Sequence, residues 1–373
     1  MVGGSSKWKG RWLIACALIS AGLLVALAGC GGSKSSSGGG KTGYDEVLAA
    51  VQGLSGKERR DRLVELAEKE GGELTLYTSM GGDNVPQLVD AFEDAFDIDV
   101  ASYRANSETI VPRLLEEASA GFHGADVVRV QGLAMSNLNG EGILVGYDSP
   151  ARKRLIEGTT FPGWTADSFS TFVVAWNTDL VPEDKAPTSW EALADPRWRG
   201  LVAIEAGDVN WYASLWNYWV NEQGKSEQEA DRLFEAIARN ARVISGHTLL
   251  GQLMASGEVA LGPNYRARVV DFEKDHAPVS WEPAVEPVFP EPQGVGLVKG
   301  SEHPAAALLF VDWLLGDAQP LLVEFGQDAA RKDLVAAPSV SRRVIDVTKI
   351  AAKEQTWADH YEQLLRLGKV LEK

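Results

Sequence analysis

Several polar segments of this chain follow predicted β-strands, and their residue types suit the binding of a small charged ligand. In the first half of the chain the candidate ligand-binding residues are Ser79, Gly81, Asn106, Ser107, Arg129 and Gln131. Backbone N–H groups and hydroxyls at the start of a helix can hold an anion, and an arginine can bind one through two parallel hydrogen bonds. Helix caps and solvated strand ends use the same residue types, so these alternatives stay open.

A second group of polar segments lies in the other half of the chain, again between strands and helices. Its candidate residues are Asp208, Asn210, Trp211, Ser245, His247, Tyr265 and Arg266. Trp211 could stack on a sugar ring, although its helical spacing with Leu215 and Trp219 fits a core face equally well. His247 could ligate a metal, but a lone histidine in a loop more often caps a helix or contacts water.

No pattern typical of a catalytic site accompanies these residues. The five histidines of the chain have no metal-binding spacing, and no P-loop or dinucleotide fingerprint stands between a strand and a helix. The nucleophile elbow of hydrolases is also missing. Carboxylate pairs are plentiful, so residue counts alone do not exclude a glycosidase. The sequence favours binding over catalysis, with no resident cofactor.

The elements that must position the polar segments alternate between strand and helix. Strands are expected at residues 73–79, 98–103, 125–130, 201–204, 243–244 and 259–261. Amphipathic helices fill the intervals between them. This alternation predicts an α/β fold whose largely parallel sheet is covered by helices. Because ligands bind beyond the carboxyl ends of such strands, we expect the polar segments to face one cleft.

One long apolar strand, residues 167–177, separates the two series of elements. Its expected partner is a proline-rich return near residues 279–298, and together they would form a double hinge, with Trp176 and Asn177 as hinge residues. After a helical segment at 44–71, the expected lobes are 72–170 plus 283–373 and 171–282. Ligand sites favour such lobe interfaces.

The first 29 residues have the pattern of a bacterial lipoprotein signal peptide. Basic residues precede an apolar run that ends in Leu27-Ala28-Gly29-Cys30. A transmembrane anchor is the alternative, but the run is shorter than the roughly 20 residues that a span needs. Cys30 is expected to carry lipid, and the Gly/Ser-rich residues 30–43 to form a flexible tether. The sequence therefore predicts an exported protein, lipid-anchored on the periplasmic or extracellular face of the cell membrane.

Charge and cysteine content exclude several classes of protein. The formal net charge of −16 argues against a nucleic-acid partner, which needs a concentrated basic surface. The only cysteines are Cys16 and Cys30, one in the removed peptide and one at the lipidation position, so no disulfide is expected. We expect a monomer with a large core.

Five segments resemble the extracellular solute-binding proteins of bacterial ABC importers. They are Glu73–Ser79, Ala125–Val128, Pro187–Gly200, Ser256–Leu261 and Gly294–Val298. The nearest group is the branch that contains ferric-iron-binding proteins and their phosphonate- and other anion-binding relatives. The resemblance implies a type II periplasmic-binding-protein fold. In it two α/β lobes, joined by crossing hinge strands, close over one ligand and deliver it to a membrane permease.

The resemblance leaves the ligand open. Ferric-binding members typically carry two adjacent tyrosines where this chain has Tyr265 followed by Arg266. Tyr265 would be a metal ligand only if Fe(III) is transported, whereas an arginine repels that ion and suits a phosphonate, sulfonate or carboxylate. The predicted function is a substrate-binding lipoprotein for Fe(III) or a small oxyanion. The alternatives are a sugar-binding ABC component and a ligand sensor that docks to a membrane receptor.

Overall fold

The computed structural model describes residues 43–82, 84–337 and 339–370 of the 373-residue chain. The predicted signal peptide, the lipidation position Cys30 and nearly all of the predicted tether lie outside these residues. Within the described ranges no helix combines the length and the apolar character that a membrane span requires. The expectation of a lipid anchor therefore stays a prediction from the sequence.

The first series of elements alternates as the sequence predicts. It runs β1 (Glu73–Thr78), α3 (Asn84–Phe96), β2 (Asp99–Arg104), α4 (Ser107–Ser119), β3 (Val127–Gln131) and α5 (Gly132–Gly140). β1 pairs in parallel with both β2 and β3. α3 buries Val85, Leu88 and Phe92, whose spacing places them on one helical face.

The second series repeats this arrangement. It runs β7 (Val202–Glu205), α6 (Val209–Asn217), α7 (Glu227–Asn240), β8 (Ala241–Ile244), α8 (His247–Ala255), β9 (Leu261–Tyr265) and α9 (Arg266–Lys274). β7 pairs in parallel with β8 and β9. α7 begins at a capping box, in which the Ser226 and Glu229 side chains each bond the other's backbone N–H, which stabilises a helix start.

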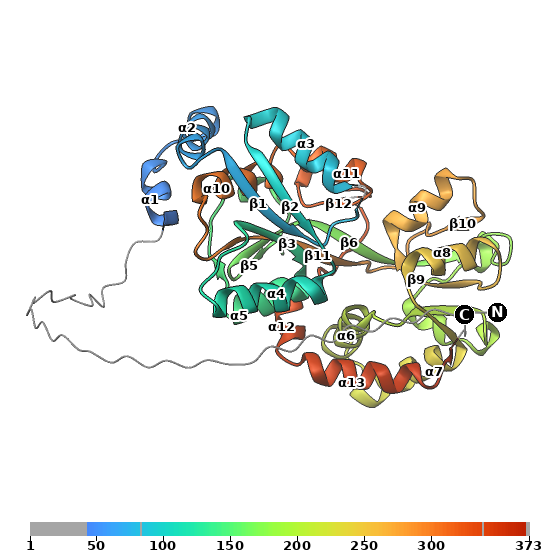
Figure 1. Cartoon of the computed structure of the whole chain (residues 1–373). Helices are drawn as coiled ribbons and strands as arrows, with labels where there is room; N and C mark the ends of the chain where they lie inside the picture. Colours follow the sequence, from blue (N-terminus) through green and yellow to red (C-terminus); the bar gives the residue numbers. More distant parts are fainter. Residues whose placement is uncertain (1–42, 83, 338, 371–373) are drawn as a thin grey trace, which may run out of the picture. The chain divides into compact units, whose positions relative to one another are not determined.

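Two long antiparallel strands join the series. β6 (Trp164–Asn177) pairs with β9 on one side and with β11 (Phe289–Val298) on the other, and β11 in turn pairs with β3. The strand order is β13-β8-β7-β9-β6-β11-β3-β1-β2, so both long strands lie at the centre of the sheet (Figure 1). The predicted pairing of a crossing strand with a proline-rich return is therefore present.

The remaining elements cover the sheet and its edges. The helices are α1 (Gly43–Ala50), α2 (Gly56–Lys69), α10 (Pro304–Leu315), α11 (Gln319–Glu324), α12 (Val347–Ala351) and α13 (Glu354–Leu365). The short strands are β4 (Leu144–Val145), β5 (Thr160–Phe161), β10 (Val279–Ser280), β12 (Asp328–Ala329) and β13 (Lys369–Val370). α10 is buried around nearly its whole circumference, as expected for a helix in the interior of a large core.

The end of the chain packs on the second series. The Tyr361 hydroxyl of α13 donates to the Glu205 carbonyl over 2.6 Å, and β13 pairs in parallel with β8. These contacts favour assigning the last helix to the lobe of residues 171–282 rather than to that of 72–170. The lobe boundaries themselves stay a prediction.

Candidate ligand-binding cleft

A cleft of about 620 Å³ lies where the two series of elements meet. Its lining comes from four places: Gly81 and Asn84 before α3; Phe169 and Ser170 of β6; several residues of 245–252 and 265–271; and the segment 325–327. The volume is in the range of small-molecule sites. Of the ligand-binding residues predicted from sequence, Gly81, Ser245, His247 and Tyr265 line it.

On the second-series side, a histidine and two carboxylates form a cluster at the ends of β7 and β8. His247 Nε2 lies 3.0 Å from Asp208 Oδ1. Glu205 Oε1 accepts the Gly246 N–H, which fixes the loop that carries His247. Burial raises the pKa of Asp208 to about 6. Burial alone would lower the His247 pKa, but the adjacent Asp208 carboxylate leaves that pKa raised, so the pair readily holds a proton between its two members.

A second buried acid lies beside this cluster. Glu291 of β11 accepts hydrogen bonds from the Tyr265 hydroxyl at 2.8 Å and from the Asn210 amide at 2.7 Å. Burial raises the pKa of Glu291, and burial together with the Glu291 charge raises that of Tyr265 well above its usual value. The Tyr265 ring packs on His247, with 3.9 Å between ring centroids. This wall of the cleft is therefore acidic, with a protonated phenol.

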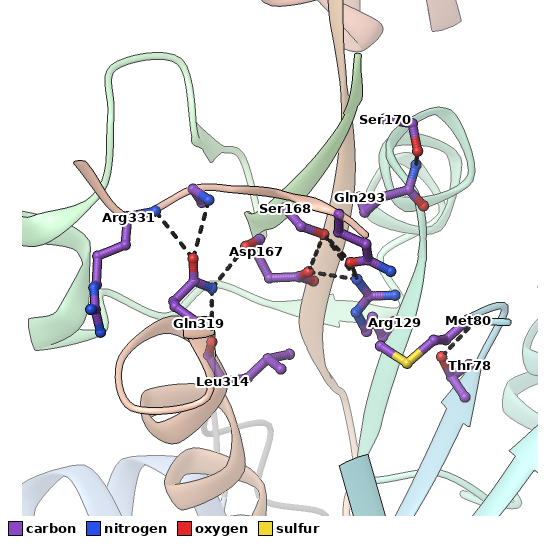
Figure 2. Close-up of polar contacts among 12 residues, drawn as sticks. Thr78, Met80, Arg129, Asp167, Ser168, Ser170, Gln293, Leu314, Gln319 and Arg331 are labelled. Carbon is purple, nitrogen blue, oxygen red and sulfur yellow. Dashed lines mark hydrogen bonds and ion pairs between the residues drawn. The ribbon is translucent and has the colours of Figure 1, made fainter. Parts of the chain in front are cut away.

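Arg129 lies beneath the first-series wall and is committed to protein groups. Its Nη2 donates to Asp167 Oδ1 at 2.7 Å and to Ser168 Oγ at 3.0 Å (Figure 2). It also donates to Gln327 Oε1 at 2.7 Å. Arg129 is 1% exposed and is absent from the cleft lining, whereas Gln327 belongs to it. The arginine thus positions a cleft residue, Gln327.

Arg266 is also paired with protein. Its guanidinium bonds Asp328, with 2.8 Å between Nε and Oδ1, and faces the ring of Trp281. It lines a separate cavity of only about 20 Å³. The arginine in the cleft lining is instead Arg268, two residues further along α9.

The other residues predicted from sequence lie elsewhere. Trp211 is 0% exposed and packs against Trp190 and Phe234, so its ring has no face free for a sugar. The remaining ligand-binding candidates also lie outside the cleft lining: Asp208 and Asn210 at the start of α6, Ser79 after β1, Asn106 and Ser107 at the start of α4, and Gln131 at the end of β3. The predicted hinge residues, Trp176 and Asn177, are buried at the end of β6.

Sequence reasoning missed several residues of the site region, among them Glu205 and Arg268. It also missed Glu291 and Gln327, which reach the site through pairing between segments distant in the chain: Glu291 opposite Ser170 on β6, and Gln327 next to Asp328, which pairs with Phe169. A lone glutamate in a proline-rich stretch was the only available signal for Glu291. Nothing in the local pattern marks Gln327.

Comparison with known families gives one match over more than half of the chain. Residues 125–341 match the family described as bacterial extracellular solute-binding protein. The matched range includes β3, both central strands and all of the second series. It therefore contains most of the cleft lining, apart from Gly81 and Asn84.

Solved structures of such proteins share the fold at low sequence identity. The Trichodesmium protein IdiA (FutA), in complex with iron and citrate, is 18% identical over 79% of this chain and 99% of its own, with a TM-score of 0.64. Iron-bound HitA from Pseudomonas aeruginosa is 20% identical over 79% and 98%, with a TM-score of 0.62. AfuA from Actinobacillus pleuropneumoniae, with fructose-6-phosphate bound, is 20% identical over 79% and 96%, also with a TM-score of 0.62. These likenesses confirm the predicted type II periplasmic-binding-protein fold.

Proposed function

The chain belongs to the family of bacterial extracellular solute-binding proteins, and on this premise we propose that it is the lipid-anchored substrate-binding component of an ABC importer. Proteins of this family are transport components and not enzymes. The proposed protein captures a small polar ligand outside the cell membrane and delivers it to a permease. Its anchor would be the acylated Cys30, on the periplasmic or extracellular face.

The observation that carries this proposal is the cleft between the two series of elements. About 620 Å³ is enclosed by residues from both of them, and β6, which crosses from one to the other, supplies Phe169 and Ser170 in between. A ligand in this position contacts both lobes at once. It can therefore favour a closed form through contacts that the open form lacks, which is the thermodynamic requirement for ligand-driven closure.

The class of ligand is narrowed by the charges around the cleft. Glu205, Asp208 and Glu291 lie behind the lining residues His247 and Tyr265 and form no ion pair with lysine or arginine within the described ranges. The arginine of the lining, Arg268, is paired with Asp271, and Arg266, which lies outside the lining, is paired with Asp328. The carboxylates behind the second-series wall would repel a bare oxyanion. Among the ligand classes predicted from sequence, an oxyanion therefore has less support than a ligand with positive charge. For a sugar, the lining offers the half-buried ring of Phe325 as a stacking partner, whereas Phe169 is only 2% exposed.

Among the solved structures with a similar fold, one contains iron with citrate and another contains fructose-6-phosphate. Both kinds of ligand should therefore be included in the test. A thermal-shift panel on the purified protein would contain ferric citrate, phosphonates, sulfonates, sugars, a sugar phosphate and divalent metal salts. A ligand that binds only the folded state raises the unfolding temperature by mass action. We expect the compounds of one ligand class to raise the unfolding temperature of the protein. Stabilisation by none, together with unchanged solute uptake in a deletion strain, would contradict the proposed function.

A further inference from the structure

We propose that Glu205, Asp208 and His247 form a binding site for one divalent first-row transition-metal ion in the second-series wall of the cleft. The inference rests on the proposed function in one respect, because the ion would be the transported solute or would hold it. The metal-binding chemistry itself depends only on the three side chains.

The three side chains already converge. One ligand atom from each lies within 4.8 Å of those from the other two. Donor atoms around a single ion at metal–ligand distances near 2.1 Å lie up to about 4 Å apart, so only a small contraction is needed. Two loops hold the donors in place: Asp208 precedes α6, and His247 begins α8 at the end of the loop that Glu205 fixes.

A buried oxygen in this cluster lacks a partner. Asp208 is 4% exposed, and its Oδ2 has no hydrogen-bond donor within the described residues. The same holds for Nδ1 of His247. Buried polar atoms of a native protein are nearly always satisfied, and an unpaired carboxylate oxygen is costly to bury. A cation bound to Oδ2 would satisfy it.

The charges around the cluster also favour a bound cation. His247 is the only basic side chain paired with either carboxylate of the cluster among the described residues, and Glu291 adds a further acid nearby. His247 Nε2 and Asp208 Oδ1 lie 3.0 Å apart. A metal ion bound to both would also balance the charge of the second carboxylate.

The donor set selects the kind of ion. Imidazole nitrogen with carboxylates suits Zn²⁺, Mn²⁺ and similar ions, whereas Mg²⁺ and Ca²⁺ are held by oxygen ligands alone. Three protein ligands leave a coordination position open for water or for a chelating solute. His247 lines the cleft, so the ion would be accessible from there.

A second histidine–aspartate pair shows what a structural pair looks like in this protein. His303 Nδ1 also lies 3.0 Å from a carboxylate oxygen, Asp126 Oδ2. Both oxygens of Asp126, however, already accept other hydrogen bonds, from the Thr75 N–H and from the Ser301 hydroxyl. Both oxygens of Asp126 are therefore satisfied, and the part of the chain that the structure describes places no third metal-ligand group with this pair, which makes His303 a matched control.

The test is calorimetric titration of the purified, chelator-stripped protein with ZnCl₂ and with MnCl₂. We expect one ion per chain for at least one of the metals. Asp208→Asn and His247→Gln should each weaken binding by more than about tenfold, because loss of even an outer-shell partner of a metal ligand weakens binding about 10- to 100-fold, while His303→Gln should bind like wild type. Co²⁺ substitution gives a second measurement, because its visible ligand-field bands should be lost in His247→Gln.

Four outcomes would test the metal site and the proposed function. The site would be overturned if wild type and the two cluster variants bound the metal equally well, or if His303→Gln lost binding as much as the cluster variants do. Absence of Zn²⁺ and Mn²⁺ binding would overturn it too, and a solute from the panel that still stabilises the protein would then leave the proposed function standing. Metal binding that depends on the cluster, with no effect of gene deletion on uptake of the ion or of any solute, would support the site and contradict transport.

Discussion

Arg129 on β3 and Asp167 on β6 form an ion pair shut away from solvent, with 2.7 Å between Nη2 and Oδ1 and side chains 1% and 0% exposed. The pair joins the first series to the strand that crosses to the second. Through Ser168 it also holds Gln327, a residue of the cleft lining. The role of the Arg129–Asp167 pair is to position Ser168 and Gln327.

Replacing Arg129 should therefore lower the free energy of unfolding. Arg129→Met leaves the Asp167 carboxylate buried without its cation, and breaking such a pair costs about 3–5 kcal/mol. Urea denaturation measures this cost. Arg343→Gln is the control, because its 2.7 Å ion pair with Glu222 is half exposed and should contribute less than about 1 kcal/mol. Equal losses in the two variants would contradict the role given to Arg129.

Replacing Glu291 should alter how stability depends on pH. Burial raises the Glu291 pKa in the folded protein, so the folded state holds this proton at higher pH than the unfolded state, whose value is about 4.3. Its contribution to stability is then present at low pH and declines as pH rises above that value. Glu291→Gln lacks this decline, and its amide oxygen can still accept from Tyr265.

The Glu291→Gln variant should consequently gain stability relative to wild type as the pH is raised from about 4. Thermal unfolding of both proteins across this range measures the difference. A difference that stays constant with pH would show that Glu291 titrates alike in the folded and unfolded states.

Asn177 ties together the turn that ends β6. Its Oδ1 accepts the N–H groups of Asp179 and Leu180, and its Nδ2 donates to the Met254 carbonyl at 2.7 Å. Asn177→Ala leaves the buried Met254 carbonyl and two part-buried N–H groups without these bonds and should cost about 1–3 kcal/mol in chemical denaturation. Asn221→Ala, an exposed asparagine with one contact, should change stability by less than about 0.5 kcal/mol. As a predicted hinge residue, Asn177 should also affect the affinity for every ligand by a similar factor.

Lipid attachment at Cys30 predicts where the protein is found in fractionated cells. Wild type should sediment with membranes, because several acyl chains anchor a protein stably. Cys30→Ala should move it to the soluble fraction, or leave an unprocessed precursor. Cys16→Ala is the matched control, since it changes the only other cysteine and leaves the lipidation position intact. Processed Cys30→Ala protein in the membrane fraction would contradict the anchor.

Elements whose pattern is local were predictable from sequence. The strand expected at 167–177 extends to Trp164 in the structure, and the apolar face of Val85, Leu88 and Phe92 forms the expected helix. Both depend on side-chain periodicity within a short stretch, which reflects burial of one face. The order of strands and helices, and hence the fold class, follows from such stretches.

Contacts between distant segments were not predictable in the same way. Tyr265 meets Glu291 because β9 and β11 flank the same strand, with Phe172 of β6 opposite Tyr265 on one side and Phe289 on the other. A change of register by one residue would turn Glu291 to the other face of the sheet. Arg266 likewise finds Asp328 through β12. The side chains left free for a ligand emerge only once these pairings are known.

The central claim is that the cleft at the junction of the two series binds the solute, and a variant that fills it tests this most directly. Ser245 lines the cleft at its exposed edge, and Ser245→Trp would occupy part of its volume. Ser119→Trp, at the exposed last residue of α4, is the control. Calorimetric titration with the ligand that stabilises wild type should show binding to wild type and Ser119→Trp, and affinity reduced by at least about tenfold, or 1.4 kcal/mol, for Ser245→Trp. Unchanged affinity in a folded Ser245→Trp protein would contradict the claim.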